Sequence, residues 1–411
     1  MHKSKVFSFL IMLAFFYFPE QMFGQEKMSS AQVEEKSYDL YLHKSWKELV
    51  VLGNSAIKQG YDYYYLRMRI GCAYYEQGNY LSADKQFKKA LEFSSGDPTA
   101  EEYLYFCYIY TGRYEEARKL SKLFTKELAR KIGTDSLSAV SFVIIEGGIK
   151  TSDSSTLFHN ATYAQAGLGH YVNNSFSLFH AVTYYTESEF RGKTSQFQYY
   201  LLANVPMKND WLISPAFQWI YRENTPPPVQ EPPPVRIGPR PPPPPAPSAS
   251  SSNYFIGSLQ ARKKLGHFYF TIGGTISNID SNAQYMQTAS ISYFPFGNSR
   301  LIIGTQGYLV ESGRYGNETA ISPFVSCMPF KSLTLSASYL NSSVYHLIEG
   351  DGYIVNNSFD LTPSRWTFQC SVSLSKNLSV YGLYQLENKV ESIANFKYNY
   401  QAFIIGLKFI P

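Results

Sequence analysis

Strict alternation between apolar and small polar residues is the feature that most limits how this chain can fold. In RWTFQCSVSLS, residues 365–375, every second side chain is apolar and the side chains between them are polar or charged. LTLSASY at 333–339 repeats the pattern, and residues 402–409 place an apolar side chain at every second position. Because successive strand residues point to opposite faces, each stretch predicts a strand with one apolar face.

A soluble β-sandwich also alternates, so three further features decide between the two folds. Many predicted strands run for about ten residues or more, close to the length that crosses a bilayer. Aromatic residues gather at strand ends, as in YFPFGNS and NFKYNY, where interfacial girdles lie. Short connections such as VNNS and PMKND alternate with longer, more polar ones such as TESEFRGKTS, ESGRYGNET and IEGDGYIVNNSFDLTPS.

These features predict that residues 135–411 form an antiparallel transmembrane β-barrel of roughly fourteen strands, with about twelve and about sixteen left open. The fold class is therefore α + β, with a helical domain before the barrel. An even strand count keeps both ends of the barrel on the periplasmic side. The predicted lipid-facing positions are Trp366, Phe368, Cys370, Val372, Leu374, Phe403, Ile405, Leu407 and Phe409.

Bulk composition supports a surface that faces something other than water. Charged residues make up 17% of the chain and aromatic residues another 17%, with 35 tyrosines. The net charge is +5 without any cluster of Lys and Arg, which argues against nucleic acid as a partner. The expected partners are instead outer-membrane lipid and protein.

The N-terminus has the pattern of a secretory signal. A short basic start with Lys3 and Lys5 precedes the apolar run VFSFLIMLAFFYF, and Gly24 offers a small residue for cleavage. We therefore expect residues 1–24 to be a signal peptide and the mature chain to begin in the periplasm. An uncleaved anchor is the alternative, although the run is shorter than the roughly 20 residues that a spanning helix needs.

Residues 25–134 are predicted to be helical and to repeat every 34 residues. The matching positions resemble tetratricopeptide (TPR) repeats, in which small residues allow close helix contact and aromatic residues fill the groove between helix pairs. Two and a half to three copies lie near the lower limit for a stable solenoid. The resemblance implies a surface that docks a periplasmic protein, while a role as a spacer or plug remains the alternative. The residues that carry the motif are Trp46, Gly71, Tyr74, Gly78, Tyr80, Ala83, Phe87, Ala90, Tyr108, Gly112, Tyr114 and Ala117.

No pattern for chemistry stands out in the sequence. The seven His residues are scattered and form no recognisable pair with a nucleophile or a metal ligand. The four Cys residues have no CxxC spacing, which argues against zinc and thiol redox chemistry. We therefore predict no enzyme activity and no catalytic, cofactor-binding or metal-binding residues.

A Pro-rich run, TPPPVQEPPPVRIGPRPPPPPAPSASSS, occupies residues 225–252. Alternating stretches precede and follow it, so it is predicted to be an external loop within the barrel rather than a domain boundary. Pro cannot donate to a β-ladder, which explains its absence from the flanking strands. The predicted boundary between domains is KIGTD at 131–135.

The order of signal peptide, short repeat array and barrel resembles YaiO-type outer-membrane proteins and, more distantly, the exporters of cellulose and poly-N-acetylglucosamine. This resemblance implies a non-enzymatic role in envelope export or assembly, with polysaccharide or secreted protein as cargo and the repeats docking a partner. The alternative is a passive, porin-like diffusion channel with the repeats as plug or spacer. A barrel hydrolase is a third hypothesis, for which no residue pattern speaks.

Overall fold

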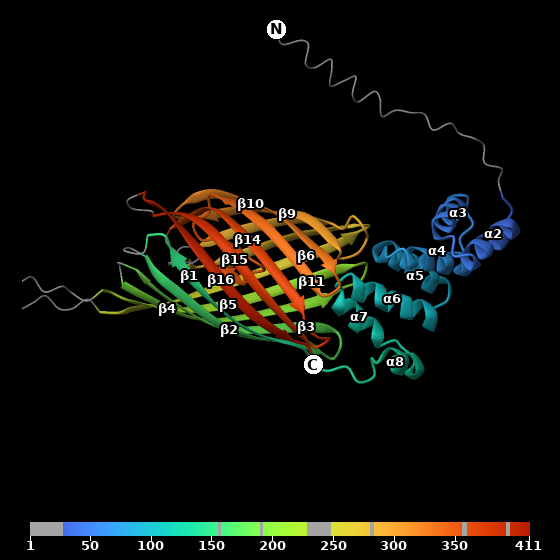
Figure 1. Cartoon of the computed structure of the whole chain (residues 1–411), viewed down its shortest axis with the longest axis horizontal. Helices are drawn as coiled ribbons and strands as arrows, with labels where there is room; N and C mark the ends of the chain where they lie inside the picture. Colours follow the sequence, from blue (N-terminus) through green and yellow to red (C-terminus); the bar gives the residue numbers. More distant parts are fainter. Residues whose placement is uncertain are drawn as a thin grey trace, which may run out of the picture.

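The structure is a computed structural model that describes residues 28–154, 158–189, 192–227, 248–279, 283–355, 360–391 and 395–411. The expected signal peptide, 1–24, lies outside the described residues, as do residues 228–247 of the expected Pro-rich loop. A helical domain and a β-barrel lie end to end, with the helices at one mouth of the barrel (Figure 1). We call this mouth the helical end and the opposite mouth the loop end.

The described helices are arranged as pairs that repeat along the chain. Helices α2, α4 and α6 start at residues 30, 64 and 98, and α3, α5 and α7 start at 46, 80 and 114, which is a step of 34 in both series. None of the described helices has the length and apolar character needed to cross a membrane. The seven helices are α2 (Ser30–Leu42), α3 (Trp46–Lys58), α4 (Tyr64–Glu76), α5 (Tyr80–Phe93), α6 (Pro98–Tyr110), α7 (Tyr114–Ser121) and α8 (Lys126–Ile132).

Close packing between α4 and α5 depends on one glycine. A Cβ atom at Gly71 would lie 2.7 Å from Cε1 of Phe87, so only glycine lets the aromatic ring lie flat against α4. Phe87 is fully buried and its ring stacks on that of Tyr103 from α6, at 5.0 Å between centroids. This core joins three successive helices and makes the hairpins one structural unit.

The barrel is closed, and every pair of neighbouring strands is antiparallel, including the pair β1 and β16 that completes the ring. Fourteen strands form it within the described residues, which confirms the predicted barrel and its strand number. They are β1 (Val140–Ser152), β2 (Phe158–Val172), β3 (Phe176–Glu189), β4 (Gly192–Pro206), β5 (Trp211–Thr225), β6 (Ser250–Leu265), β7 (Phe268–Ser277), β8 (Gln284–Tyr293), β9 (Leu301–Ser312), β10 (Gly316–Phe330), β11 (Leu333–Ser342), β14 (Leu361–Ser373), β15 (Leu378–Val390) and β16 (Lys397–Phe409).

Two of the predicted long loops are largely strand. In TESEFRGKTS, strand pairing continues to Glu189 and Gly192, and in ESGRYGNET it continues to Ser312 and Gly316. Paired backbone groups satisfy one another whatever the polarity of their side chains, so polar composition alone is a poor guide to where a strand ends. A two-stranded hairpin, β12 (Ile348–Glu349) and β13 (Ile354–Val355), occupies the connection between β11 and β14.

Candidate functional site

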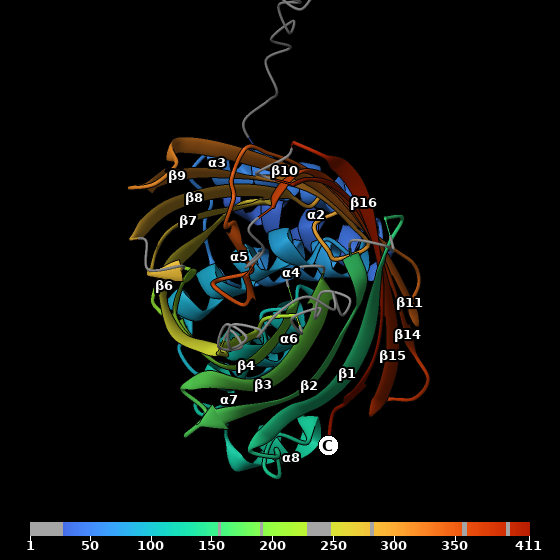
Figure 2. The same cartoon turned by 90° about the vertical axis from the view of Figure 1, so that its left-hand side faces the viewer.

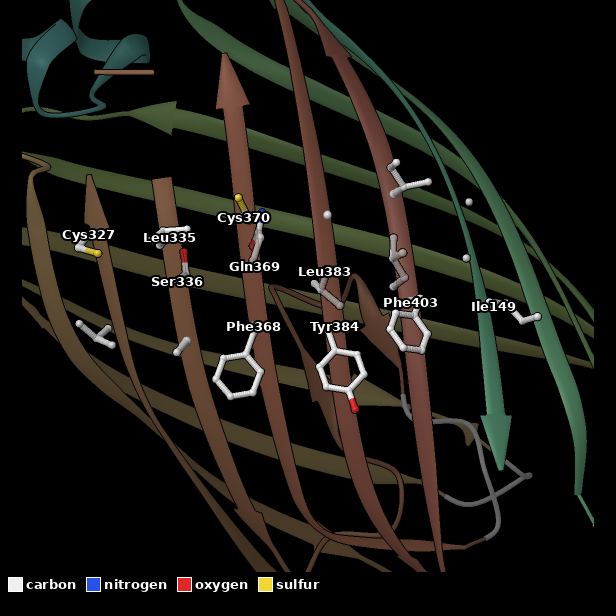
Figure 3. Close-up of a pocket in the computed structure, with 17 residues that line it drawn as sticks. Ile149, Cys327, Leu335, Ser336, Phe368, Gln369, Cys370, Leu383, Tyr384 and Phe403 are labelled. Atoms are coloured by element: carbon white, nitrogen blue, oxygen red, sulfur yellow. The ribbon is translucent and has the colours of Figure 1, made fainter. Parts of the chain in front are cut away.

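The nine predicted outward positions all carry exposed side chains, eight of them on barrel strands and Leu374 in the turn after β14. Apart from Cys370, which is also exposed, their exposed fractions run from 37% at Val372 to 66% at Ile405. A shallow apolar groove of about 890 Å³ runs across this wall, where Gly147 and Gly382 carry no side chain. Figure 3 shows the rings of Phe368, Tyr384 and Phe403 side by side on neighbouring strands along it.

Half of the twelve residues assigned to the repeat motif are buried in the core of the helical domain. Ala83, Phe87 and Ala90 are fully buried, and Tyr108 and Ala117 are nearly so. Gly78 and Gly112 occupy equivalent turns, with φ of 72° and 71°, in the left-handed region that favours glycine.

The aromatic members of the motif differ in their surroundings. The ring of Trp46 meets that of Tyr41 at 5.8 Å, and Tyr80 packs on Tyr110 at 4.7 Å. The hydroxyl of Tyr74 accepts a hydrogen bond of 3.0 Å from Asn54. Tyr114 is exposed, at the mouth of the barrel.

The turn before α5 sits directly on the barrel. The backbone N–H of Leu81 donates to the carbonyl oxygen of Gly297 at 3.0 Å, and the side-chain amide of Asn298 donates to the carbonyl oxygen of Gly78 at 2.8 Å. Gly297 has a φ of 65°, and a Cβ atom there would lie only 1.9 Å from Oδ1 of Asn79. The β8–β9 turn and the helical domain therefore meet through backbone atoms, which requires glycine at 297.

One carboxylate, Asp84 on α5, is fully buried at this interface. Nζ of Lys264, on β6, donates to both of its oxygens at 2.9 and 3.0 Å, and Arg113 forms a buried ion pair with it. Lys88 pairs in turn with Asp210 of the β4–β5 turn. Burial alone would raise the pKa of Asp84, but the surrounding positive charges outweigh that effect and hold the pKa well below its ordinary value. Asp84 is therefore an anion that joins the helical domain to the barrel.

Helix α7 adds a second group of contacts with the same mouth. Nε of Arg118 donates to Oδ1 of Asn174 at 2.7 Å, and Nζ of Lys119 donates to the carbonyl oxygen of Pro206 at 2.9 Å. The hydroxyl of Ser177 donates to Glu115 at 2.9 Å. Seen along the barrel from the loop end, α4, α5 and α6 lie across the far mouth (Figure 2). The helical domain thus has the position of a plug.

The connection between β11 and β14 folds back into the barrel near the loop end. Its residues Val344, Leu347 and Ile348 are buried, and Figure 2 shows the segment, in orange-red, inside the ring of strands. Its apolar side chains form a cluster with inward-facing strand residues Ile220, Tyr254, Ile256, Met286, Tyr308, Val310, Ala320 and Leu340. Apolar contact therefore holds this loop inside the lumen. An ion pair of 2.6 Å between Glu349 of the hairpin and Arg365 of β14 adds to it.

The tip of the β12–β13 hairpin reaches a polar layer of the lumen. The backbone carbonyl of Tyr353 accepts a hydrogen bond of 3.4 Å from the side-chain amide of Gln218. The ring of Tyr353 packs on the ring of Tyr200, with 4.9 Å between their centroids. The hydroxyl of Tyr200 donates to the carbonyl oxygen of Asp351 at 3.2 Å. These contacts hold the tip beside residues near the middle of strands β4 and β5.

A polar chamber of about 410 Å³ lies between the two obstructions. Gly112, Tyr114 and Glu115 of the helical domain line one side of it, and Gly350 and Asp351 of the hairpin tip line another. The barrel wall contributes Asn204, Leu212, Ser214, Gln260, Arg262, Thr271, Ser290 and Gln306. Most of the side chains that line it are polar or charged, in contrast to the apolar outer face.

The lumen wall elsewhere holds acidic residues in satisfied networks. Glu146 accepts from Gln165 at 2.8 Å and from the hydroxyls of Tyr163 and Tyr381, and Glu387 pairs with Lys150 at 2.7 Å. Within the described ranges, no three His, Cys, Asp or Glu side chains are grouped as a metal site would require.

The sequence did not reveal the Asp84 cluster, the in-folded hairpin or the chamber. One signal was available for the hairpin: the loop sequence SSVYHLIEGDGYIV carries Val344, Leu347 and Ile348, which an exposed loop would leave in water. Asp84 gave no comparable signal, because Lys264 is 180 residues away.

Comparisons with known proteins agree in architecture only. No family model matches the sequence, and no curated protein is detectably similar to it. Acinetobacter baumannii Omp33, an outer membrane protein, is 12% identical with a TM-score of 0.37, over 66% of this chain and 99% of its own. The P. putida toluene transporter TodX is 8% identical with a TM-score of 0.44, over 67% and 91%. A bacterial polysaccharide outer membrane secretin is 8% identical with a TM-score of 0.40, over 67% and 100%. Likeness at this level carries no argument about function, which rests on the residues of this chain.

Proposed function

We propose that this chain is a non-enzymatic outer-membrane barrel whose lumen is held closed from both ends. It opens only when a partner displaces the helical domain and the in-folded hairpin also leaves the lumen. The exposed apolar belt on the outer face, together with polar groups inside, is the pattern of a barrel that spans a bilayer. The observation that carries the proposal is the fully buried Asp84, whose ion pair with Lys264 of β6 fixes the helices on the barrel mouth.

The orientation follows from the connections between strands. Bacterial barrels have short turns on the periplasmic side, and the turns that contact the helical domain, such as 173–175 and 266–267, are short. In this proposed orientation the helical domain is periplasmic, and β5 ends and β6 begins at the mouth that faces the cell surface.

The helical pairs, which we take to be TPR repeats, leave a surface for a partner. The described contacts with the barrel come from α5, α6, α7 and their turns, while α2 and α3 point away from it (Figure 1). Exposed apolar side chains such as Leu42 and Val51 lie on these free helices. A periplasmic protein of an export or assembly complex, for polysaccharide or for secreted protein, is the partner that we propose.

The alternative, a passive diffusion channel, shares the plug but needs a lumen that is permanently open. Two obstructions in series oppose this reading, because a path blocked at one point does not conduct even when the other point is clear. Removing either obstruction alone is therefore expected to leave the conductance low.

Planar-bilayer conductance tests the proposal. Gly297→Val drives a side chain into Asn79 and lifts the plug, and the double substitution Leu347→Asp with Ile348→Asp expels the hairpin, because two charges cannot stay in its apolar cluster. Gly316→Val is the matched control, since Gly316 also has a positive φ, 77°, but has nothing within 4 Å of the added Cβ.

We expect the unmodified chain and the Gly316→Val control to be silent, and the chain that combines both sets of substitutions to give large, steady channels. Steady channels from the unmodified chain would favour the passive pore. Silence of the combined variant, with the barrel folded, would refute a conducting role.

A further inference from the structure

The chamber holds an arginine of the barrel wall whose charge acts on two nearby carboxylates, Asp351 and Glu116, without a direct bond to either among the described residues. Arg262, on β6, makes no hydrogen bond or ion pair within the described residues, and its guanidinium carbon lies 5.5 Å from the centre of the Tyr269 ring. An arginine held over an aromatic face keeps its planar fork of N–H donors available to another group.

An opposing negative charge comes from the hairpin. Asp351 has a φ of 61°, and its backbone carbonyl is fixed by Tyr200, but its carboxylate has no hydrogen bond among the described residues. Glu115 of the helical domain lines the same chamber, with one oxygen engaged by Ser177. Three separate elements, the barrel wall, the hairpin and the helical domain, thus bring one cation and two carboxylates together.

We propose that the chamber binds a small zwitterion of dipeptide size, with its carboxylate on Arg262 and its ammonium group toward Asp351. Polar groups in a partly dry site require partners, and a molecule with one charge of each sign supplies both. The amide and hydroxyl side chains of Gln260, Gln306 and Ser214 offer donors and acceptors for a peptide bond between the two charges. The volume of about 410 Å³ falls within the range of small-molecule sites.

This inference rests on the proposed function, because the solute must reach a chamber that is enclosed by the plug on one side and by the hairpin on the other. Equilibrium dialysis of the full chain in detergent avoids any dependence on the rate of access. The probes are alanyl-alanine, N-acetyl-alanyl-alanine, which lacks the ammonium group, alanyl-alanine amide, which lacks the carboxylate, and glucose as an uncharged comparison.

Two substitutions separate the two charges. Arg262→Gln is expected to weaken the binding of alanyl-alanine and of its N-acetyl form by about tenfold or more, because a charge-assisted bond to the carboxylate is lost. The binding of the amide should be unchanged. Asp351→Asn is expected to weaken the binding of alanyl-alanine and of the amide and to leave the binding of the N-acetyl form unchanged. Arg314→Gln is the matched control, since Arg314 also lies over a tyrosine ring, that of Tyr315 at 5.4 Å, but outside the chamber.

The crossed pattern of losses supports the site. Failure of alanyl-alanine to bind, binding of glucose as tight as that of alanyl-alanine, or equal losses for all three peptides in both variants would overturn it. Because dialysis does not depend on conductance, a chain that binds alanyl-alanine but fails the bilayer test would sink the gating proposal alone.

Discussion

Replacing Asp84 with asparagine tests the attachment of the helical domain most directly. The substitution keeps the shape of the side chain but leaves Arg113 and Lys264 without the carboxylate that both contact. Removing one partner of a buried ion pair costs about 3–5 kcal/mol, because the remaining charge stays buried without compensation. At about 1.4 kcal/mol per factor of ten, the undocked population rises by roughly 10²-fold to roughly 4 × 10³-fold.

The backbone amide of Leu81 reports undocking without a label. It lies in the first turn of α5, where a helix offers its N–H groups no internal partner. Its hydrogen bond goes to Gly297 of the barrel instead. Hydrogen exchange at this amide therefore requires the two domains to separate, and its rate follows the undocked population.

Glu92→Gln is the matched control for this measurement. Glu92 lies on the same helix and pairs with Lys89, but both side chains are exposed, and such pairs contribute about 0–1 kcal/mol. We expect Leu81 to exchange on the order of 10²-fold faster in the Asp84→Asn variant than in the control. Equal rates in the two variants would mean that the buried ion pairs do not hold the plug.

Three further predictions concern the same interface, the helical core and the outer face. The depressed pKa of Asp84 means that its contribution is present above its ordinary value of 3.8 and is lost only as pH falls below that value toward the docked-state pKa. In a His267→Gln background, which removes the titrating side chain that contacts Asn79 and Ser82, protection of Leu81 should therefore stay level from about pH 7 to about pH 4.5, and loss of protection within that range would contradict it. Gly71→Val places a side chain against Phe87 and should destabilise the helical domain by about 1–3 kcal/mol, seen as a lower thermal midpoint in circular dichroism; an unchanged midpoint would show that the helices can separate freely. Ile405→Arg should cost about 2–4 kcal/mol of folding stability in lipid, and Leu374→Arg, in the β14–β15 turn, about 0–1 kcal/mol; urea titrations in vesicles that gave equal costs would argue against a lipid-facing wall.

The parts of the fold that the sequence predicts are those set by local periodicity. Alternation such as that in residues 365–375 specifies a strand and its apolar face without reference to any other strand. Once the strands were predicted, barrel closure and an approximate strand number could be predicted as well. Antiparallel strands joined by short turns have few other ways to cover their edges. The 34-residue spacing likewise reflects contacts within neighbouring hairpins, such as that of Gly71 with Phe87.

The candidate site depends on contacts between distant parts of the chain, which periodicity does not encode. Asp84 looks like an ordinary surface residue of a helix until Lys264 is brought beside it. Arg262 and Asp351 likewise meet only because one loop turns inward rather than outward. The apolar cluster around Leu347 stabilises the inward conformation of this loop. It offsets the free-energy cost of placing polar backbone groups inside the barrel.

The seating of the helical domain also sets an order of assembly. Its contacts come from four separate turns or strand ends, at Asn174, Asp210, Lys264 and Gly297. These residues stand at their mutual spacing only once the strands from β2 to β9 are paired. Until then Asp84 can pair with Arg113 but not with Lys264 of the barrel, and the surface that the plug binds is not formed. The helical domain can therefore dock only after this side of the barrel has folded correctly. A factor that binds the uncovered interface would distinguish unfinished barrels from finished ones.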